Sequence, residues 1–334
     1  MVKNEQKKPK GKPKAAAARA DTCEPLKAAV VRGDLRLGGF AHGDYPGLKL
    51  PAKTTPEIRT VGAWEAKKPQ SWGLDWHCNE GIEFTFLLHG HLPFATGGKE
   101  WMLRQGHFTV TRPWQPHKVG NPAVPASHLC WFILDVGARH PHQAWLWPDW
   151  LVLSPADLRR LTDLLRHNEQ PVWSAGPELG RQFHDLSVLL EKSGTAFPET
   201  RVKLRINEIL VQVLDLLERK NIALNANLSS TRRAAELFLA TLPQKLAHPW
   251  TLAEMAHACG LGRSQFSRYA RELTGRTPIE HLTFLRLAAA EDMLAREPKR
   301  KITDIALACG FGSGQYFATV FKRNKGKVPK EGRA

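Results

Sequence analysis

Side chains suited to reading DNA bases gather in two short segments near the end of this 334-residue chain. In the major groove Gln pairs bidentately with adenine and Arg with guanine, whereas a Lys or Arg late in a helix more often contacts phosphate. The chemistry that these residue types predict is hydrogen bonding to duplex DNA. The residues expected to make it are Arg263, Ser264, Gln265, Ser267, Arg268, Arg271, Ser313, Gly314, Gln315, Thr319, Lys322 and Arg323.

The elements that must position these side chains form an internal repeat. Residues 255–262, with the sequence MAHACGLG, reappear in degenerate form as residues 305–312, with the sequence IALACGFG. Each copy is expected to be a short apolar helix that ends at Gly and leads through a tight turn into a second helix. This order predicts two helix-turn-helix units. A helix from Pro278 to about Ala295 would connect them, and Thr251 with Glu254 forms a capping box at the start of the first.

Aromatic residues are expected to hold the second helix of each unit, which we call the reading helix, against the rest of that unit. In the first reading helix, predicted from about Arg263 to Thr274, Phe266 and Tyr269 should face inward. In the second, predicted from about Ser313 to Lys325, Phe317 and Phe321 should do so. One copy of this helix-turn-helix pattern could be an ordinary helical hairpin. Two copies joined by a connecting helix are much less consistent with that interpretation.

The stretch from about Trp250 to Arg333 resembles the DNA-binding domain of the AraC/XylS family of transcriptional regulators. The resemblance implies sequence-specific DNA binding, with base-reading positions at Ser264, Gln265 and Arg268 and at Gly314, Gln315 and Thr319. The segments that carry it are Leu252-Ala253-Glu254-Met255-Ala256, Gly260-Leu261, Gly275-Arg276-Thr277-Pro278, Leu285-Arg286-Leu287-Ala288-Ala289-Ala290, Ile302-Thr303-Asp304-Ile305-Ala306, Gly310-Phe311, Tyr316-Phe317 and Phe321-Lys322-Arg323.

Some residues depart from the family's pattern. Ala270 stands where the family usually has Phe, and Gly262 and Gly312 stand where it usually has Ser. Thr319 replaces a frequent Arg, and Gly314 has no side chain. The second unit therefore has fewer side chains for base readout, which favours phosphate contacts there.

The family resemblance also implies an upstream sensing and dimerising domain, often a cupin β-barrel. Short apolar runs at residues 82–88, 101–103, 108–111 and 129–135 predict strands, the first ending at His89-Gly90, and Gly97-Gly98 predicts a hairpin turn. Many short strands with Gly and Pro turns are typical of a sandwich or barrel. The partial cupin motifs are His77-x-Asn79-x3-Glu83, with Asn in place of one His, and then Gly106, Pro113, Pro116-His117 and Asn121.

Three interpretations of the cupin-like residues stay open. His77, Glu83 and His117 could converge inside a barrel and bind a divalent metal, since strand residues alternate inward. The missing His favours instead a small-molecule effector site, and simple packing of the barrel is the third interpretation. We predict no metal and no cofactor. We predict a small effector, with a sugar-like one suggested by the many Trp residues nearby, at His77, Asn79, Glu83, Trp114 and His117.

The region between the two domains has helical periodicity. Ser154-Pro155 predicts a helix start, and residues 180–192 and 201–220 continue the pattern. The apolar face of residues 201–220 could pack in the core or form a dimer seam. The predicted fold class is therefore α+β multidomain: a disordered basic arm at 1–22, a cupin-like effector-sensing β-barrel at 23–150, a helical dimerisation or linker segment at 151–228, and an all-α DNA-binding domain with two helix-turn-helix units at 229–334.

Composition narrows the function classes. The formal net charge of +16 favours polyanionic partners. No run of about 18 apolar residues predicts a membrane span, and no secretory signal, nucleophile elbow or phosphate-binding loop is present. We predict a cytoplasmic, nucleoid-associated homodimer that binds double-stranded DNA and is not an enzyme. The alternative is a cupin metalloenzyme with an accessory nucleic-acid-binding helical domain.

Overall fold

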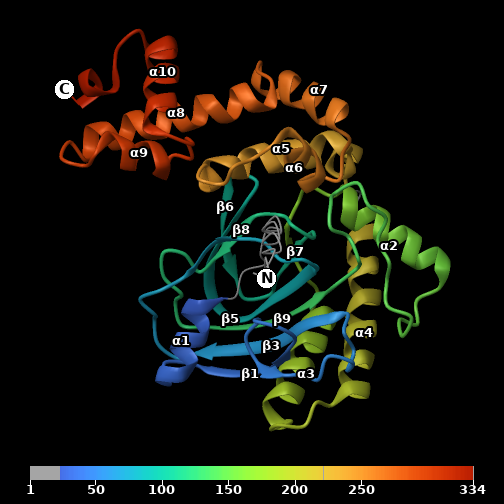
Figure 1. Ribbon diagram of the computed structural model, residues 1–334. Helices are drawn as coiled ribbons and strands as arrows, with labels where there is room; N and C mark the ends of the chain where they lie inside the picture. The colour runs from blue at the N-terminus through green and yellow to red at the C-terminus, as the bar shows by residue number, and fades with distance from the viewer. Residues whose placement is uncertain (1–22, 221, 334) are drawn as a thin grey trace, which may run out of the picture. The chain divides into compact units, whose positions relative to one another are not determined.

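The computed structural model describes residues 23–220 and 222–333, so the predicted basic arm at 1–22 lies outside the described residues. The chain divides into two compact bodies (Figure 1). The N-terminal body runs to Ala234 and the C-terminal body begins at Ala235. The predicted fold class, a β-rich domain followed by helices and an all-α domain, is confirmed.

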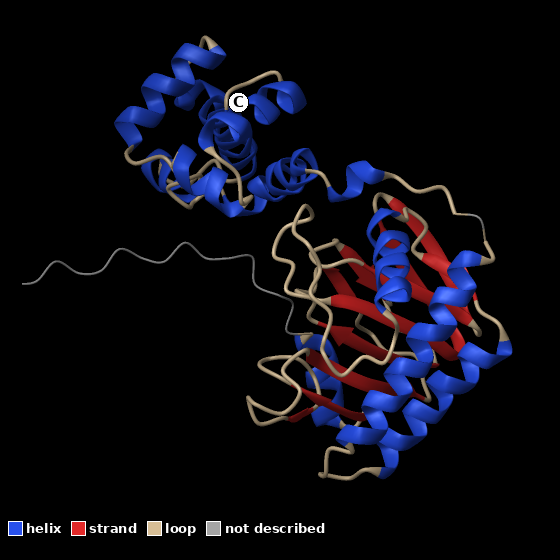
Figure 2. Ribbon diagram, turned by 90° about the vertical axis from the view of Figure 1, so that its right-hand side faces the viewer, coloured by secondary structure: helices blue, strands red, loops and turns tan. Residues whose placement is uncertain are grey.

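The N-terminal body is built on one curved sheet of ten strands within the described residues. The main strand order is β10-β7-β5-β9-β3-β1-β2, with β4, β6 and β8 attached beside β5. No pairing among the described strands joins β10 to β2, so the sheet is open, and the term barrel applies only loosely (Figure 2). The strands are β1 (Arg36–Ala41), β2 (Leu48–Lys49), β3 (Ile58–Ala66), β4 (Leu74–His77), β5 (Ile82–Thr96), β6 (Lys99–Arg104), β7 (His107–Thr111), β8 (His117–Val119), β9 (Ser127–Leu134) and β10 (Val172–Ser174).

Strand β5 is longer than the sequence predicts. The prediction that it ends at His89-Gly90 is wrong, because the chain passes a register shift between Leu87 and His89 and continues to Thr96. Gly90 has a φ of +85°, which a glycine adopts without strain. The second half of β5 then pairs with β6 and β8. The predicted turn at Gly97-Gly98 is confirmed as the β5–β6 hairpin, with φ values of 57° and 76°.

Helices cover one face of this sheet (Figure 2). They are α2 (Pro155–His167), which begins at the predicted Ser154 cap, α3 (Pro177–Lys192) and α4 (Glu199–Glu218). Phe183 of α3 packs on Phe86, Phe108 and Phe132 of the sheet within one core. The apolar face of α4 lies mostly in the same core, and the helix leaves Leu204 and Val211 exposed. A dimer seam on α4 stays a prediction.

The opposite face of the sheet holds a second core. Helix α1 (Glu24–Arg32) buries Leu26 and Ala29 there, together with Trp64 and Trp131. The cupin-like residues lie on this face of the sheet, next to the second core.

The segment that follows α4 is tied back to the N-terminal body. Asn168, just after α2, forms an isolated β-bridge with Leu224. The backbone N–H of Asn225 donates to the carbonyl of His167 at 2.7 Å. The Arg112 guanidinium, next to β7, donates to the carbonyl of Asn168. Backbone contacts therefore hold the linker against residues 167–168, and the Arg112 side chain supports that segment.

The C-terminal body is all-α within the described residues. Its first helix, α5 (Thr231–Thr241), crosses the division at Ala235. The others are α6 (Leu252–Ala258), α7 (Arg263–Thr274), α8 (Pro278–Arg296), α9 (Ile302–Ala308) and α10 (Gly314–Lys325), with 3₁₀ turns at Leu242–Lys245 and Pro329–Arg333. The predicted capping box at Thr251 and Glu254 is confirmed, and α8 begins with a second one at Thr277 and Glu280. No helix in the described part of either body has the length and apolarity to cross a membrane.

Candidate functional site

Helix α7 is the first reading helix and presents most of its predicted contact residues. Arg263, Ser264, Arg268 and Arg271 are exposed, and Gln265 and Ser267 are half-buried. The guanidinium of Arg268 lies 4.9 Å from the centre of the Tyr269 ring, and its Nε lies 3.9 Å from Glu272 Oε1. These contacts orient Arg268 along the exposed side of α7.

One inward position on α7 differs from the sequence prediction. Phe266 is fully buried as predicted, but Tyr269 is half-buried, and Ala270 takes the second inward position. Residues four apart lie on the same face of a helix, so Ala270 follows Phe266 into the core. The small Ala side chain allows close packing there, and Tyr269 is left at the edge beside Arg268.

Helix α10 is the second reading helix. Phe317 and Phe321 are fully buried, as predicted. Ser313 caps the helix, and its hydroxyl accepts the Tyr316 N–H at 3.1 Å, so this side chain is already used within the protein. A Cβ on Gly314 would lie 3.0 Å from Thr303 Oγ1, which shows how closely α10 approaches α9.

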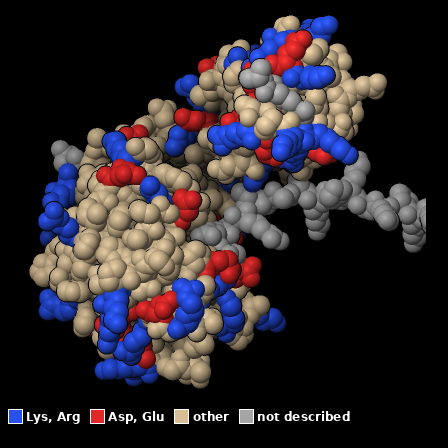
Figure 3. Space-filling view, turned by 90° about the vertical axis from the view of Figure 1, so that its left-hand side faces the viewer, with Lys and Arg blue, Asp and Glu red and all other residues tan. Residues whose placement is uncertain are grey.

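The exposed side of α10 is polar at its start and basic at its end. Gln315 and Thr319 are exposed, and the Thr319 hydroxyl donates to the Gln315 carbonyl at 3.1 Å. Lys322 and Arg323 are exposed in the last turn. Tyr316, in the first turn of α10, was not predicted as a contact and is 59% exposed. Figure 3 shows Lys and Arg side chains along the visible face of the C-terminal body, with some Asp and Glu among them.

Helix α8 joins the two reading helices. Leu287, Ala290 and Leu294 share one core with the second unit, and α8 also packs against α6 and α7 of the first. Its 19 residues give a length of about 28 Å. Successive major grooves on one face of DNA lie about 34 Å apart. The length of the connecting helix is thus of the same order as the spacing of successive major grooves.

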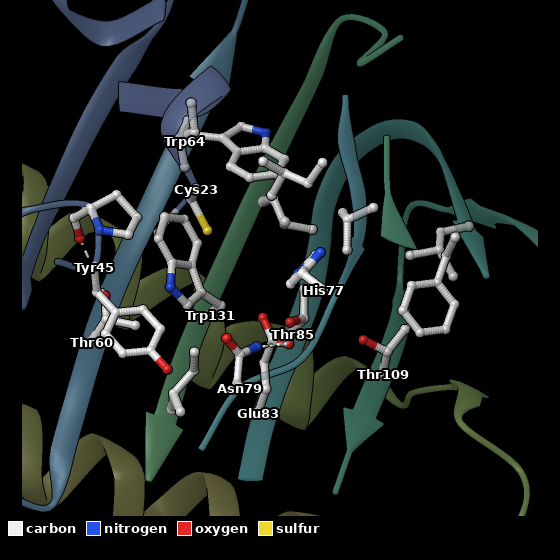
Figure 4. Close-up of a pocket in the computed structure, with 18 residues that line it drawn as sticks. Cys23, Tyr45, Thr60, Trp64, His77, Asn79, Glu83, Thr85, Thr109 and Trp131 are labelled. Atoms are coloured by element: carbon white, nitrogen blue, oxygen red, sulfur yellow. Dashed lines mark hydrogen bonds between the residues drawn. The ribbon is translucent and has the colours of Figure 1, made fainter. Parts of the chain in front are cut away.

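Four of the predicted effector residues, His77, Asn79, Glu83 and His117, converge inside the N-terminal body. Figure 4 shows the first three of them. Glu83 Oε2 accepts from Asn79 Nδ2 at 3.0 Å and from Thr111 Oγ1 at 3.1 Å, and it lies 2.9 Å from His117 Nε2. The His77 and His117 rings are 4.2 Å apart. Burial by itself would raise the pKa of Glu83, but the hydrogen bond and charge of His117 outweigh it and the pKa is lowered. Glu83 is therefore a carboxylate at neutral pH.

The cavity beside Glu83 is small. Its volume is about 30 Å³, and a single water needs at least about 10–15 Å³ by the same kind of measure. Its lining includes His77, Asn79 and Glu83, with Trp64 and Trp131 on the apolar side. The lining also includes residues that we did not predict, such as Tyr45 from the loop after β1, whose pKa burial raises above its usual value.

Two predicted effector residues, His117 and Trp114, are not part of the cavity lining. His117 lies behind it, against Glu83, whereas Trp114 is directed elsewhere. Its indole N–H donates to the Ala138 carbonyl at 3.1 Å, and its backbone N–H donates to the Asn79 carbonyl at 2.7 Å. The backbone at Trp114 has a φ of 62°, which turns the side chain away along the β7–β8 loop. Trp114 therefore contacts the site through its backbone. No group of three or more His, Cys, Asp or Glu among the described residues could hold a metal ion.

Each of the two bodies is similar to a known protein family. A helix-turn-helix domain family matches residues 255–334, and a cupin domain family matches residues 65–132. The HTH-type transcriptional activator RhaS of Citrobacter koseri is 30% identical over 277 residues, which are 83% of this chain and 93% of that protein. The thermoregulatory protein LcrF of Yersinia pestis is 27% identical over 270 residues, which are 77% of this chain and 90% of that protein. A crystal structure of an AraC-type transcriptional regulator from Chromobacterium violaceum covers 31% of this chain and 91% of its own, at 25% identity and a TM-score of 0.29.

Proposed function

The chain belongs to the AraC/XylS family of transcriptional regulators, and we propose which residues contact DNA and which hold the effector. It is a DNA-binding regulator of transcription. The observation that carries the residue assignment is the pair of exposed, basic reading helices on the single connecting helix α8. The metalloenzyme alternative is not favoured, because the named relatives are regulators.

In the first unit, Ser264, Gln265 and Arg268 are assigned to base edges. They lie in the first half of α7, with Arg268 exposed, and Gln and Arg have the hydrogen-bond geometry for adenine and guanine. Arg263, Ser267 and Arg271 flank them on the same helix. In the second unit, Gln315 is the longest polar side chain early in α10, and Lys322 and Arg323 in its last turn are assigned to phosphates. The first unit then supplies most of the sequence preference.

The effector is assigned to the cavity beside Glu83. A hydroxyl-bearing molecule, such as a sugar, could donate to Glu83 and stack on Trp131. Asn79 Oδ1 is buried and has no hydrogen-bond partner among the described residues, so it offers a second acceptor at the same place. Pockets for drug-sized ligands measure roughly 300–1,000 Å³. The cavity of about 30 Å³ must therefore expand on binding, and that movement is what could favour one DNA-competent state over another.

The remaining assignments rest on the sequence. Residues 151–228 are assigned to dimerisation and linkage, with Leu204 and Val211 as the exposed apolar residues on α4. A homodimer, a cytoplasmic location on the nucleoid and the absence of catalysis stay predictions.

Selection of DNA from a random pool by the full chain tests the DNA assignment. The expected result is one enriched sequence whose footprint protects two adjacent major grooves on one face, about 34 Å apart. A pool that stays random after several rounds, or protection of a single groove, would contradict it.

Thermal unfolding of the full chain in the presence of simple sugars and polyols tests the effector assignment. A true ligand at 100 times its Kd stabilises its body by about 2.7 kcal/mol. Glu83→Gln should abolish that stabilisation. Equal stabilisation of the wild type and the variant would place the ligand elsewhere.

A further inference from the structure

Arg286, in the middle of α8, contacts the loop that leads into the first helix-turn-helix unit and lies beside the turn inside the second. Its Nε donates to the Leu246 carbonyl at 3.0 Å, and its Nη2 donates to the His248 carbonyl at 2.7 Å. Both carbonyls belong to the loop that precedes α6. Burial lowers the pKa of Arg286 from its usual value, as expected for a guanidinium held inside the fold. The planar guanidinium fork suits two carbonyls in a fixed arrangement.

The turn of the second unit lies against the same loop. Gly310, which ends the first helix of that unit, has a φ of +85°. A Cβ on Gly310 would lie 2.0 Å from the Leu246 carbonyl oxygen and 2.8 Å from Arg286 Nε. Real Cβ atoms do not approach backbone oxygen so closely, so this contact requires glycine. The loop before the first unit, the connecting helix and the turn of the second unit therefore meet at one point.

The loop is also connected to the first reading helix. The Trp250 indole N–H donates to the Lys245 carbonyl at 3.1 Å. The Trp250 ring packs edge-on against Phe238 at 5.1 Å, and Phe238 packs on Phe266 of α7 at 5.7 Å. A displacement of this loop would therefore shift α7, because the Trp250 and Phe238 rings connect the two. On the other side, the Gly310 turn leads directly into α10.

We propose that Arg286 is a positioning residue that sets the spacing and angle between the two reading helices. It makes no DNA contact itself and acts through the loop at 246–250 and the Gly310 turn. This inference rests on the proposed function, because it assumes that both reading helices bind one duplex. Two binding elements on a rigid scaffold gain affinity only when their geometry matches both sites. Loosening the scaffold therefore weakens binding to the paired sites and widens the range of tolerated spacings.

The test compares full-length variants on three duplexes. The first carries the sequence that the wild type selects from a random pool, the second has one base pair inserted between the protected grooves, and the third has the second groove sequence randomised. Arg286→Met should bind the first duplex at least tenfold more weakly than the wild type and the third duplex within twofold of it. One inserted base pair should cost the wild type at least tenfold and Arg286→Met less than threefold.

Further variants separate positioning from folding. Gly310→Ala should reproduce the loss of spacing preference from the opposite side of the contact. Arg286→Lys should restore only part of it, since an ammonium lacks the fork. Arg296→Met is the matched control on the same helix, because Arg296 is exposed and pairs with Asp292, and it should leave the spacing preference unchanged. An Arg286→Met protein that keeps the wild-type spacing preference, or that loses affinity equally on all three duplexes, would overturn the proposal.

A measurement without DNA keeps this inference separate from the proposed function. Amide hydrogen exchange in Arg286→Met should rise both at residues 246–250 and at residues 310–311, while residues 314–325 stay as protected as in the wild type. Unchanged exchange at either segment would overturn the positioning role whether or not the wild type selects a DNA sequence. Failure of the wild type to select one would instead count against the DNA-contact assignments.

Discussion

Replacing Glu83 with Gln should destabilise the N-terminal body at neutral pH. Gln has nearly the same volume, so the main change is the loss of the charge that three donors share. Asn79, Thr111 and His117 all approach Glu83 Oε2, at 2.9–3.1 Å, and the Glu83 side chain is only 15% exposed. Hydrogen bonds to a charged group contribute about 1.5–3 kcal/mol each and neutral ones about 0.5–1.5. The difference is about 1–1.5 kcal/mol per bond, or about 3–4.5 kcal/mol for three bonds. The lower cost of burying a neutral amide offsets part of this, so the expected loss in unfolding free energy is about 2–3 kcal/mol.

The loss should depend on pH in one direction. The pKa of Glu83 is lower in the folded protein than its usual value of 4.5. The carboxylate therefore contributes its full stability above that value, and the contribution is lost as pH falls through the lower, folded pKa. Wild type and Glu83→Gln should thus differ fully at neutral pH and should converge as the pH falls through the lowered pKa of the folded Glu83.

Urea unfolding followed by Trp fluorescence is the appropriate assay. Ten of the eleven Trp residues precede residue 175, so the signal reports the N-terminal body. Glu65→Gln is the matched control: Glu65 lies on the same sheet, but its side chain is 39% exposed and its partner Arg36 is 3.8 Å away, so its loss should be below about 1 kcal/mol. Equal losses for the two variants, or a Glu83→Gln deficit that persists unchanged at acidic pH, would refute the reasoning.

Three further results are expected. Arg268→Ala should cost about 1–3 kcal/mol on the selected duplex and relax preference at one or two base pairs, whereas an equal loss on random DNA would identify a phosphate contact. Lys322→Ala and Arg323→Ala should each weaken binding to all sequences and reduce the salt dependence by about one unit of slope; an unchanged slope would exclude the phosphate assignment. Arg112→Met should speed amide exchange at Asn225 in the linker, and unaltered protection there would show that Arg112 does not hold it.

The parts of the structure that the sequence predicts well are those set by local chemistry. The capping box at Thr251 and Glu254 and the hairpin at Gly97-Gly98 depend on residues next to one another in the chain. The error at Tyr269 has a local cause too. The large aromatic ring of Tyr269 favours a prediction of burial. The four-residue spacing from Phe266 instead places Ala270 in the core, and a side chain as small as Ala is easily overlooked as a core residue.

The residues that line the effector cavity are only partly predictable from the sequence, because some belong to a spaced motif and others do not. His77, Asn79 and Glu83, and His117 beside Glu83, are found from cupin-like spacing in the sequence. Tyr45 and Trp64 line the same cavity from the loop after β1 and from β3, and no spacing relates them to Glu83. Trp114 follows the motif in sequence, but its left-handed backbone directs the indole to the Ala138 carbonyl instead.

The contacts that tie segments together across each body could not be read from residue patterns at all. Arg112 donates to the carbonyl of Asn168, and Arg286 to the carbonyls of Leu246 and His248. Every residue carries a backbone carbonyl, so the acceptor side of such a contact leaves no trace in the sequence. The donating Arg cannot be told apart in the sequence from the many surface cations of a chain with a net charge of +16. Burial distinguishes the two cases: it lowers the pKa of Arg112 to about 10, with nearby Arg233 adding to the effect, and a buried guanidinium must find acceptors or destabilise the fold. Burial of an Arg side chain therefore indicates a hydrogen bond between distant segments better than the sequence motif around that Arg does.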